Sequence, residues 1–278
     1  MKTLKKINAK LIIVIVLIIV AGHAYSQIKG NGNIKTQERN TEDFTGIKLT
    51  CSADLFISQG STSVIVKTDE NLLELVETTV NNGVLEIDVK GRGIRSISVL
   101  EVYITLPELV MLKNSGSGDI TFKEIFNAND LVIGISGSGD LDADLDVSNL
   151  ELNVNGSGDT ELNGVKGNFK VSLSGSGDIE AEGLKLENCL VKNSGSGDIE
   201  LKGKTNNLMV SQAGSGDLNA YNLTSVNASV TNSGSADIIL NVVEKLQVTL
   251  NGSGDLTYHG TPTKVDVRSN GSGEVYRR

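Results

Sequence analysis

The chain has 278 residues, of which 21% are charged and 38% hydrophobic, a composition that excludes an intrinsically disordered protein. Aromatic residues make up 4% and Trp is absent, so we expect a thin core of aliphatic side chains. The formal net charge of −9 disfavours binding to nucleic acid or to anionic lipid.

Residues 1–26 have the pattern of a secretory signal peptide. Four lysines precede an uninterrupted apolar run from Leu11 to Val20, and Ala24-Tyr25-Ser26 supplies small residues for cleavage before Gln27. This run is shorter than the about 20 residues that span a bilayer, so we expect export to the periplasm or cell surface, with no membrane span after cleavage. An uncleaved N-terminal anchor is the alternative. Without these residues, 21 basic and 34 acidic residues remain, a net charge of −13.

Residues 27–113 form an N-terminal part that is predicted to consist of short strands. Alternation of apolar and polar residues predicts strands at 46–50, 54–58, 63–67, 84–89 and 99–106. Asn81-Asn82-Gly83 predicts a tight hairpin turn. A helix of one or two turns is predicted between Asp69 and Val76, with Asp69 as its N-cap.

Residues 114–278 form a repeat part in which the corner Ser-Gly-Ser-Gly-Asp returns every 18 to 21 residues with few changes. Its acidic residues are Asp119, Asp140, Asp159, Asp178, Asp198, Asp217, Asp237, Asp255 and Glu274. Apolar residues stand nine and seven positions before each acid, one position after each acid except at Thr160, and three positions after each acid except Glu274. This spacing of two predicts strands with one face inward, and the fixed period is typical of a solenoid.

The pattern therefore predicts an all-β fold, a right-handed parallel β-helix with coils of about 19–20 residues and Gly/Ser/Asp corners. We attribute the corner glycines to backbone angles that are costly for other residues. A propeller or meander is the alternative. Its blades need about 40 residues, and they would not carry the same corner in every unit of half that length.

The stacked corners would place the nine acidic side chains in one row, where neighbouring charges repel by about 1 kcal/mol even in water. A row of Ca²⁺ sites would offset this repulsion, because Ca²⁺ accepts carboxylate oxygens in flexible geometry. The structural interpretation is that Asp and Ser side chains bind the N–H groups of the glycine-rich turns and hold each corner closed. Calcium-binding nonapeptide repeats have a related composition but a different spacing.

No catalytic residues stand out. His259, beside Gly260 and Pro262, is the only histidine after the signal peptide, which excludes a multi-histidine metal site. Two carboxylates can cleave polysaccharides without histidine, although here the acids are themselves the repeat. Cys189 falls in an apolar column and is expected to be a small buried side chain; a disulfide with Cys51 is the alternative.

Several motifs resemble a known family: Gly30-Asn31-Gly32-Asn33, Glu38-Arg39, Phe44-Thr45-Gly46-Ile47, Asp69-Glu70-Asn71-Leu72-Leu73, Val102-Tyr103-Ile104-Thr105-Leu106-Pro107 and the serial corners. Together they are similar to the head GIN domain family of exported bacterial proteins, which is labelled as auto-transporter adhesins. The resemblance covers nearly all of the mature chain and implies a β-helical fold and an envelope location, typical of Bacteroidetes-like bacteria. It supplies no catalytic residues. Because the sequence ends at Arg277-Arg278, right after its last corner, we do not expect the C-terminal membrane barrel of an auto-transporter.

We therefore expect an exported, non-enzymatic structural or binding module that contacts a glycan or an envelope protein and needs no cofactor. A carbohydrate-active enzyme on the same scaffold is one alternative, and a Ca²⁺-dependent surface protein is another. The repeat ends abruptly after Val275-Tyr276, so we also expect a homodimer that closes the end of the solenoid.

Overall fold

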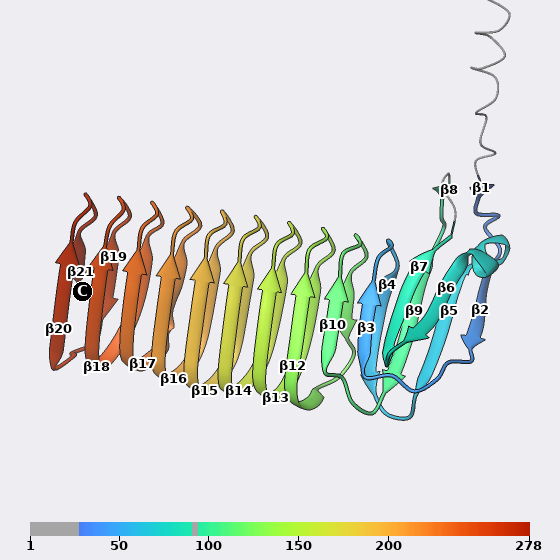
Figure 1. Ribbon diagram of the computed structural model, residues 1–278, viewed down its shortest axis with the longest axis horizontal. Helices are drawn as coiled ribbons and strands as arrows, with labels where there is room; N and C mark the ends of the chain where they lie inside the picture. The colour runs from blue at the N-terminus through green and yellow to red at the C-terminus, as the bar shows by residue number, and fades with distance from the viewer. Residues whose placement is uncertain (1–27, 91–93) are drawn as a thin grey trace, which may run out of the picture.

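The fold was analysed in a computed structural model that describes residues 28–90 and 94–278. The predicted signal peptide lies outside the described residues. Figure 1 shows a row of stacked coils that begins with β3 (Gly46–Leu49) and β4 (Asp54–Gln59) and ends with β20 (Lys264–Ser269) and β21 (Val275–Arg277). The coils wind right-handedly, which confirms the predicted parallel β-helix.

The strands of the intervening coils pair in parallel with the equivalent strands of the coils before and after them. They are β10 (Met111–Asn114), β11 (Ile120–Phe122), β12 (Phe126–Ile135), β13 (Leu141–Val154), β14 (Thr160–Leu173), β15 (Ile179–Asn193), β16 (Ile199–Gln212), β17 (Leu218–Asn232), β18 (Ile238–Leu250) and β19 (Leu256–His259). From β13 to β18, one strand leaves a corner, bends midway where the register shifts, and ends at the next corner. Each such coil therefore has two flat faces.

Residues of one sequence column are neighbours in the sheet. Leu150 lies opposite Phe169 and Leu152 opposite Val171, and all four side chains are buried. From Leu112 on, the four apolar columns form one continuous interior, as the spacing predicted, whereas Val110 at the start of its column is 40% exposed.

The corner glycines are required by close approach and not by backbone angle, so our explanation of them was wrong. Among the described residues, the glycines with φ in the left-handed region lie elsewhere, for example Gly164 at φ 91° and Gly183 at φ 63°, in the midway bends. At the corners, a Cβ on Gly137 would lie 1.6 Å from the carbonyl oxygen of Gly116 in the coil before. The stacking of corner upon corner leaves room only for hydrogen at the first glycine of the corner, whereas the second position also holds Ala53 and Ala236.

The N-terminal part adds antiparallel strands to the same sheet. These elements are β2 (Ile34–Arg39), β5 (Ser63–Asp69), the 3-10 helix η1 (Glu70–Leu75), β6 (Val76–Asn81), β7 (Val84–Val89) and β9 (Leu100–Leu106), and the short β1 (Ile28–Lys29) and β8 (Ile94–Ser96) pair separately. The predicted strands are confirmed, and so is the hairpin turn, where Asn82 and Gly83 have φ of 52° and 75°. Because β7 pairs with β3 and β9 pairs with β4, this part continues directly into the first coil.

The C-terminal end of the stack is open. Strand β20 pairs only with β18, and β21 pairs only with β19, among the strands of the described residues. The inward side chains Val265 and Val267 are therefore 41% and 42% exposed, whereas Val248 in the same column as Val267 is fully buried.

Both cysteines have free thiols. Cys189 is buried in the core, and this burial raises the pKa of its thiol to about 12, so it stays protonated at neutral pH. The interpretation of Cys189 as a small buried side chain is confirmed. In the part of the chain that the structure describes, no helix has the length and apolar character needed to cross a bilayer.

Candidate binding surface

The nine predicted acidic residues lie in one row, and each is bound to its neighbour through the backbone. The N–H of each corner acid donates to the Oδ1 of the corner acid in the coil before, at 2.7–3.0 Å. We call this row the acid ladder. Because one oxygen of every Asp in it accepts such a bond, the row links successive coils along the edge of the solenoid.

The acid ladder begins one coil earlier than the sequence predicted, at Asp54, whose Oδ1 accepts from the N–H of Asp119. The signal for it was present, since Ser52-Ala53-Asp54 matches Ser235-Ala236-Asp237 of a later corner. At the other end, the Oε2 of Glu274 accepts a hydrogen bond of 2.7 Å from the hydroxyl of Tyr276 in its own coil. In the described residues, no group of three or more His, Cys, Asp and Glu side chains is arranged to hold a metal ion.

Buried amides, rather than the corner Asp and Ser, hold several corners closed from the inside. Asn193 donates to the carbonyl oxygens of Gly197 and Gly216 at 3.0 and 3.2 Å, and its Oδ1 accepts from the N–H of Gly195 at 2.9 Å. Equivalent bonds come from Asn114, Gln212 and Asn232. The sequence interpretation identified the hydrogen-bonding role of the Asp residues but not their partner, which belongs to the next coil.

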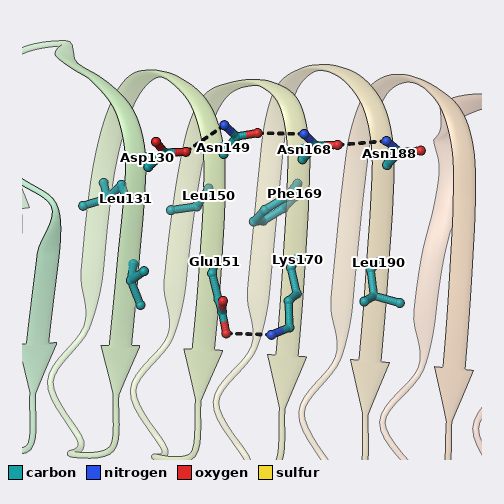
Figure 2. A pocket seen from close by; sticks show the side chains of 11 residues that line it. Asp130, Leu131, Asn149, Leu150, Glu151, Asn168, Phe169, Lys170, Asn188 and Leu190 are labelled. Carbon is teal, nitrogen blue, oxygen red and sulfur yellow. Dashed lines mark hydrogen bonds and ion pairs between the residues drawn. The ribbon is translucent and has the colours of Figure 1, made fainter.

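A second row of polar side chains runs along the face formed by the strand halves that precede the corners, which we call the amide face. The row stands ten positions before each corner acid, and Figure 2 shows its first four members. It consists of Asp130, Asn149, Asn168, Asn188, Asn207 and Asn227. Each Nδ2 donates to the Oδ1 of the residue before it in the row, at 2.7–3.2 Å. We call this row the amide ladder, and the sequence analysis missed it because Asn is also common in turns.

A shallow groove of about 320 Å³ lies beside the first half of the amide ladder (Figure 2). Glu151 and Lys170 form an ion pair of 2.7 Å across it, and Val132 is 39% exposed. The hydrogen bond from Lys170, followed by one from Asn153, lowers the pKa of the Glu151 carboxyl. This groove therefore has aliphatic walls and a neutralised pair of charges.

The opposite face, formed by the strand halves that follow the corners, is acidic over β13 to β16. Lys202 there binds the carboxylates of Glu180, Glu182 and Glu200. Its hydrogen bonds to Glu180 and Glu182 raise the pKa of the Lys202 ammonium, so it stays charged. Lys202 thus offsets part of the acidic charge of this face.

His259, the one histidine after residue 26, is the last residue of β19. Its ring meets the ring of Tyr221 edge-on, with the centroids 4.6 Å apart. This is a packing contact on the acidic face, and it brings no nucleophile or carboxylate to the imidazole.

A sequence model of the family described as "Putative auto-transporter adhesin, head GIN domain" matches residues 43–200 and 184–262. The chain belongs to this family. The resemblance drawn from the motifs is thereby confirmed, and the matched ranges run from residue 43 in the N-terminal part through the corner at Asp255.

Solved structures share the head GIN fold. A putative adhesin from Parabacteroides distasonis is 25% identical, covers 91% of this chain and 100% of its own, and has a TM-score of 0.68. A putative lipid binding protein from the same species is 26% identical, with 91% and 99% coverage and a TM-score of 0.65. A putative adhesin from Parabacteroides merdae, 21% identical with a TM-score of 0.65 over 91% and 99% of the chains, supports the fold alone. No curated protein matches the sequence.

The glycine- and asparagine-rich opening of this head GIN chain is held by a buried carboxylate. Asp69 Oδ1 accepts from the N–H of Gly32 and the hydroxyl of Ser98, at 2.6 and 2.9 Å, and Oδ2 accepts from the N–H of Ser98 at 2.8 Å. A Cβ on Gly30 would lie 2.3 Å from this carboxylate. Asp69 stands at the N-cap position of η1, as predicted, but its side chain makes no cap bond to this helix. It holds the segment of residues 30–39 instead, which we call the N-terminal arm.

Proposed function

We propose that this protein is an exported, adhesin-like module of the cell envelope that binds a glycan through its amide face and performs no catalysis. Membership of the head GIN family supports the adhesin-like role. An envelope protein is the second partner that the same flat surface would suit. The cell surface is the location we propose, because an adhesive module must be reachable from outside the cell.

The observation that carries this proposal is the amide ladder. Asn149, Asn168 and Asn188 each use one N–H and one lone pair within the row, which leaves their second N–H and second lone pair for a ligand. The side chains repeat at the strand spacing of about 4.8 Å, so the row offers donors and acceptors in a regular line. A polymer with many hydroxyl groups fits such a line better than a compact ligand does.

A glycan array tests the proposal. The wild-type protein should retain a subset of glycans, and the double variant Asn168→Ala/Asn188→Ala should lose that signal. The matched control is Asn206→Ala/Asn222→Ala, which removes two exposed amides outside the ladder. Equal binding by both double variants, or no binding by the wild type, would contradict a glycan site on the amide face.

The same experiment separates binding from a carbohydrate-active enzyme, the alternative that the fold also suits. Retained glycans should be recovered intact after long incubation. Release of shorter products that stops in an acidic-residue variant would favour the enzyme. Protease treatment of intact cells tests the location, since a surface protein should be cleaved without lysis and a periplasmic one should survive.

A lipid ligand is a second candidate. The relative from Parabacteroides distasonis that is 26% identical is described as a putative lipid binding protein. The aliphatic side chains that reach the surface of the groove in Figure 2, the exposed Val132 and the half-buried Leu190, favour an apolar ligand here. Co-sedimentation with neutral lipid vesicles, lost in a Val132→Asp variant, would support it.

A further inference from the structure

We propose that a second groove on the amide face binds the acidic sugars of a glycan, with Lys245 and Lys264 holding the carboxylate. This inference rests on the proposed glycan-binding function and names the ligand class. The second groove has a volume of about 510 Å³ and lies over β16, β17, β18 and β20.

The groove results from the side chains of two neighbouring rows. In the row eight positions before the corner acids, the short Ser229 stands between Met209 and Gln247, and this leaves a hollow. Met209 is 58% exposed at its edge. The other wall is the end of the amide ladder, so apolar and polar groups face the same space.

Two lysines replace asparagine at the end of this ladder. Lys245 lies opposite Asn227 in the sheet, and Lys264 lies opposite Lys245, so the two ammonium-bearing side chains start about 4.8 Å apart. Both are exposed, and neither takes part in the ion pairs of the described residues. Asp266, the carboxylate that lines the groove, is 4.0 Å from Arg268 instead.

Adjacent unpaired cations are unexpected in a chain with a net charge of −9. In the first groove Lys170 is paired with Glu151, and the amide ladder begins there with the carboxylate of Asp130. The second groove therefore differs from the first in having positive charge to offer. An anionic group between Lys245 and Lys264 would offset their mutual repulsion.

The last amide of the ladder also needs a donor. The Oδ1 of Asn227 is buried and has no hydrogen-bond partner, since Lys245, the next residue in the row, does not donate to it. A buried acceptor without a partner is unfavourable, and a hydroxyl group would satisfy it. A simple fatty acid supplies a carboxylate but no such donor.

A uronic acid residue combines the required groups. Its carboxylate would lie between Lys245 and Lys264, a hydroxyl would donate to Asn227 Oδ1, and the C–H face of its ring would pack on Met209. Neighbouring sugars of the same chain would continue along the amide ladder toward Asn207. The second groove would thus select acidic glycans, while the ladder contacts hydroxyl groups in general.

Calorimetric titration with an oligogalacturonate, and with the same oligosaccharide after reduction of its carboxyl groups, tests the inference. We expect the wild type to bind the acidic form at least about tenfold more tightly, as two charge-assisted contacts would give. Lys245→Gln/Lys264→Gln should abolish this preference. Lys113→Gln/Lys192→Gln makes the same charge change at two exposed lysines of the amide face outside this groove, and it should keep the preference.

The outcomes distinguish the inference from the function on which it rests. Equal affinity for both forms, or a preference that survives in Lys245→Gln/Lys264→Gln, would overturn the inference and leave glycan binding intact. An equal loss in both double variants would show a non-specific charge effect and would also overturn it. Binding of sodium laurate but of neither oligosaccharide would identify an amphiphile as the ligand, and absence of any glycan from the array would overturn both proposals.

Discussion

The backbone N–H of Asp159 donates to the Oδ1 of Asp140, 2.8 Å away in the preceding coil. The same bond recurs from Asp54 to Glu274, so a row of like charges that should repel is also a row of acceptors for charge-assisted hydrogen bonds. A short acidic side chain at each corner is thereby explained by the packing of one coil on the next.

Replacing one ladder residue should show whether the acceptor or the charge matters. Asp159→Ala removes the acceptor of the Asp178 N–H bond and should lower the free energy of unfolding by about 1 kcal/mol. Asp159→Asn keeps an acceptor oxygen and removes one repulsive charge, so it should be nearly neutral. Urea unfolding monitored by circular dichroism measures both. If Asn destabilised as much as Ala, the charge itself would be required.

Calcium should not stabilise the protein if the acid ladder is structural. One oxygen of each ladder Asp already accepts a backbone N–H, and the predicted row of Ca²⁺ sites would have to compete with those bonds. We expect no heat in a calorimetric Ca²⁺ titration and no change of melting temperature on adding a chelator. A chelator-sensitive melting temperature would revive the Ca²⁺-dependent surface protein.

A methyl group at the first corner glycine should be poorly tolerated. The Cβ of Gly156→Ala would lie 1.8 Å from the carbonyl oxygen of Gly137, so adjacent coils must separate. We expect a loss of about 2–3 kcal/mol in unfolding free energy, as for overpacked cores. Ser157→Ala in the same corner is the control and should change little, because that side chain is exposed. Similar melting temperatures for the two variants would argue against close approach as the reason for glycine.

The interior was predictable because its signal is strictly local. Columns such as Leu152 and Val171 repeat with the corner, and a spacing of two between apolar columns has one structural meaning in a solenoid. The position of the first coil could not be predicted from the repeat period. After Asp54 the chain forms β5 to β9 and returns to the stack 65 residues later at Asp119, far outside the 18 to 21 residues of the other steps.

The amide face was missed for a different reason. Outward Asn residues at 149, 168 and 188 contribute nothing to an apolar pattern, and their mutual bonds appear only when coils are stacked in register. Likewise, the amide of Asn193 occupies a position that is Leu173 in the preceding coil, so sequence alone did not show that it points inward to the corner.

The carboxylate of Asp69 should make the N-terminal arm sensitive to acid. Burial alone would raise the pKa of this carboxyl, but hydrogen bonds from Ser98 and Gly32 outweigh it and hold the pKa below its ordinary 3.8. A depressed pKa in the folded state means that the stabilisation is complete above the unfolded value and is lost as the pH falls through the lower folded one. The arm should therefore loosen below about pH 3.8, in the range where Asp69 takes up its proton.

Asp69→Asn should produce the same loosening at neutral pH. An amide cannot accept all three of the bonds from Gly32 and Ser98, and we expect a loss of about 2 kcal/mol in the stability of the arm. Hydrogen exchange read by mass spectrometry should speed up in β2 (residues 34–39) and remain unchanged in β14. Asp88→Asn, at an exposed carboxylate of the same part, is the control. Unaltered exchange in β2 would show that other contacts hold the arm.

The open C-terminal coil should promote weak self-association. Strand β20 has an unpaired edge, and its inward Val265 and Val267 are about 40% exposed where the equivalent side chains of inner coils are buried. Two such ends can pair antiparallel and place Asp266 opposite Arg268 of the other copy, which offsets their charges. The contact is one coil wide, so we expect a dimer only at high concentration. Sedimentation should show a concentration-dependent mass that Val267→Lys abolishes and Thr231→Lys, on the exposed side of an inner coil, preserves. A monomer at every concentration would mean that this end stays open in solution.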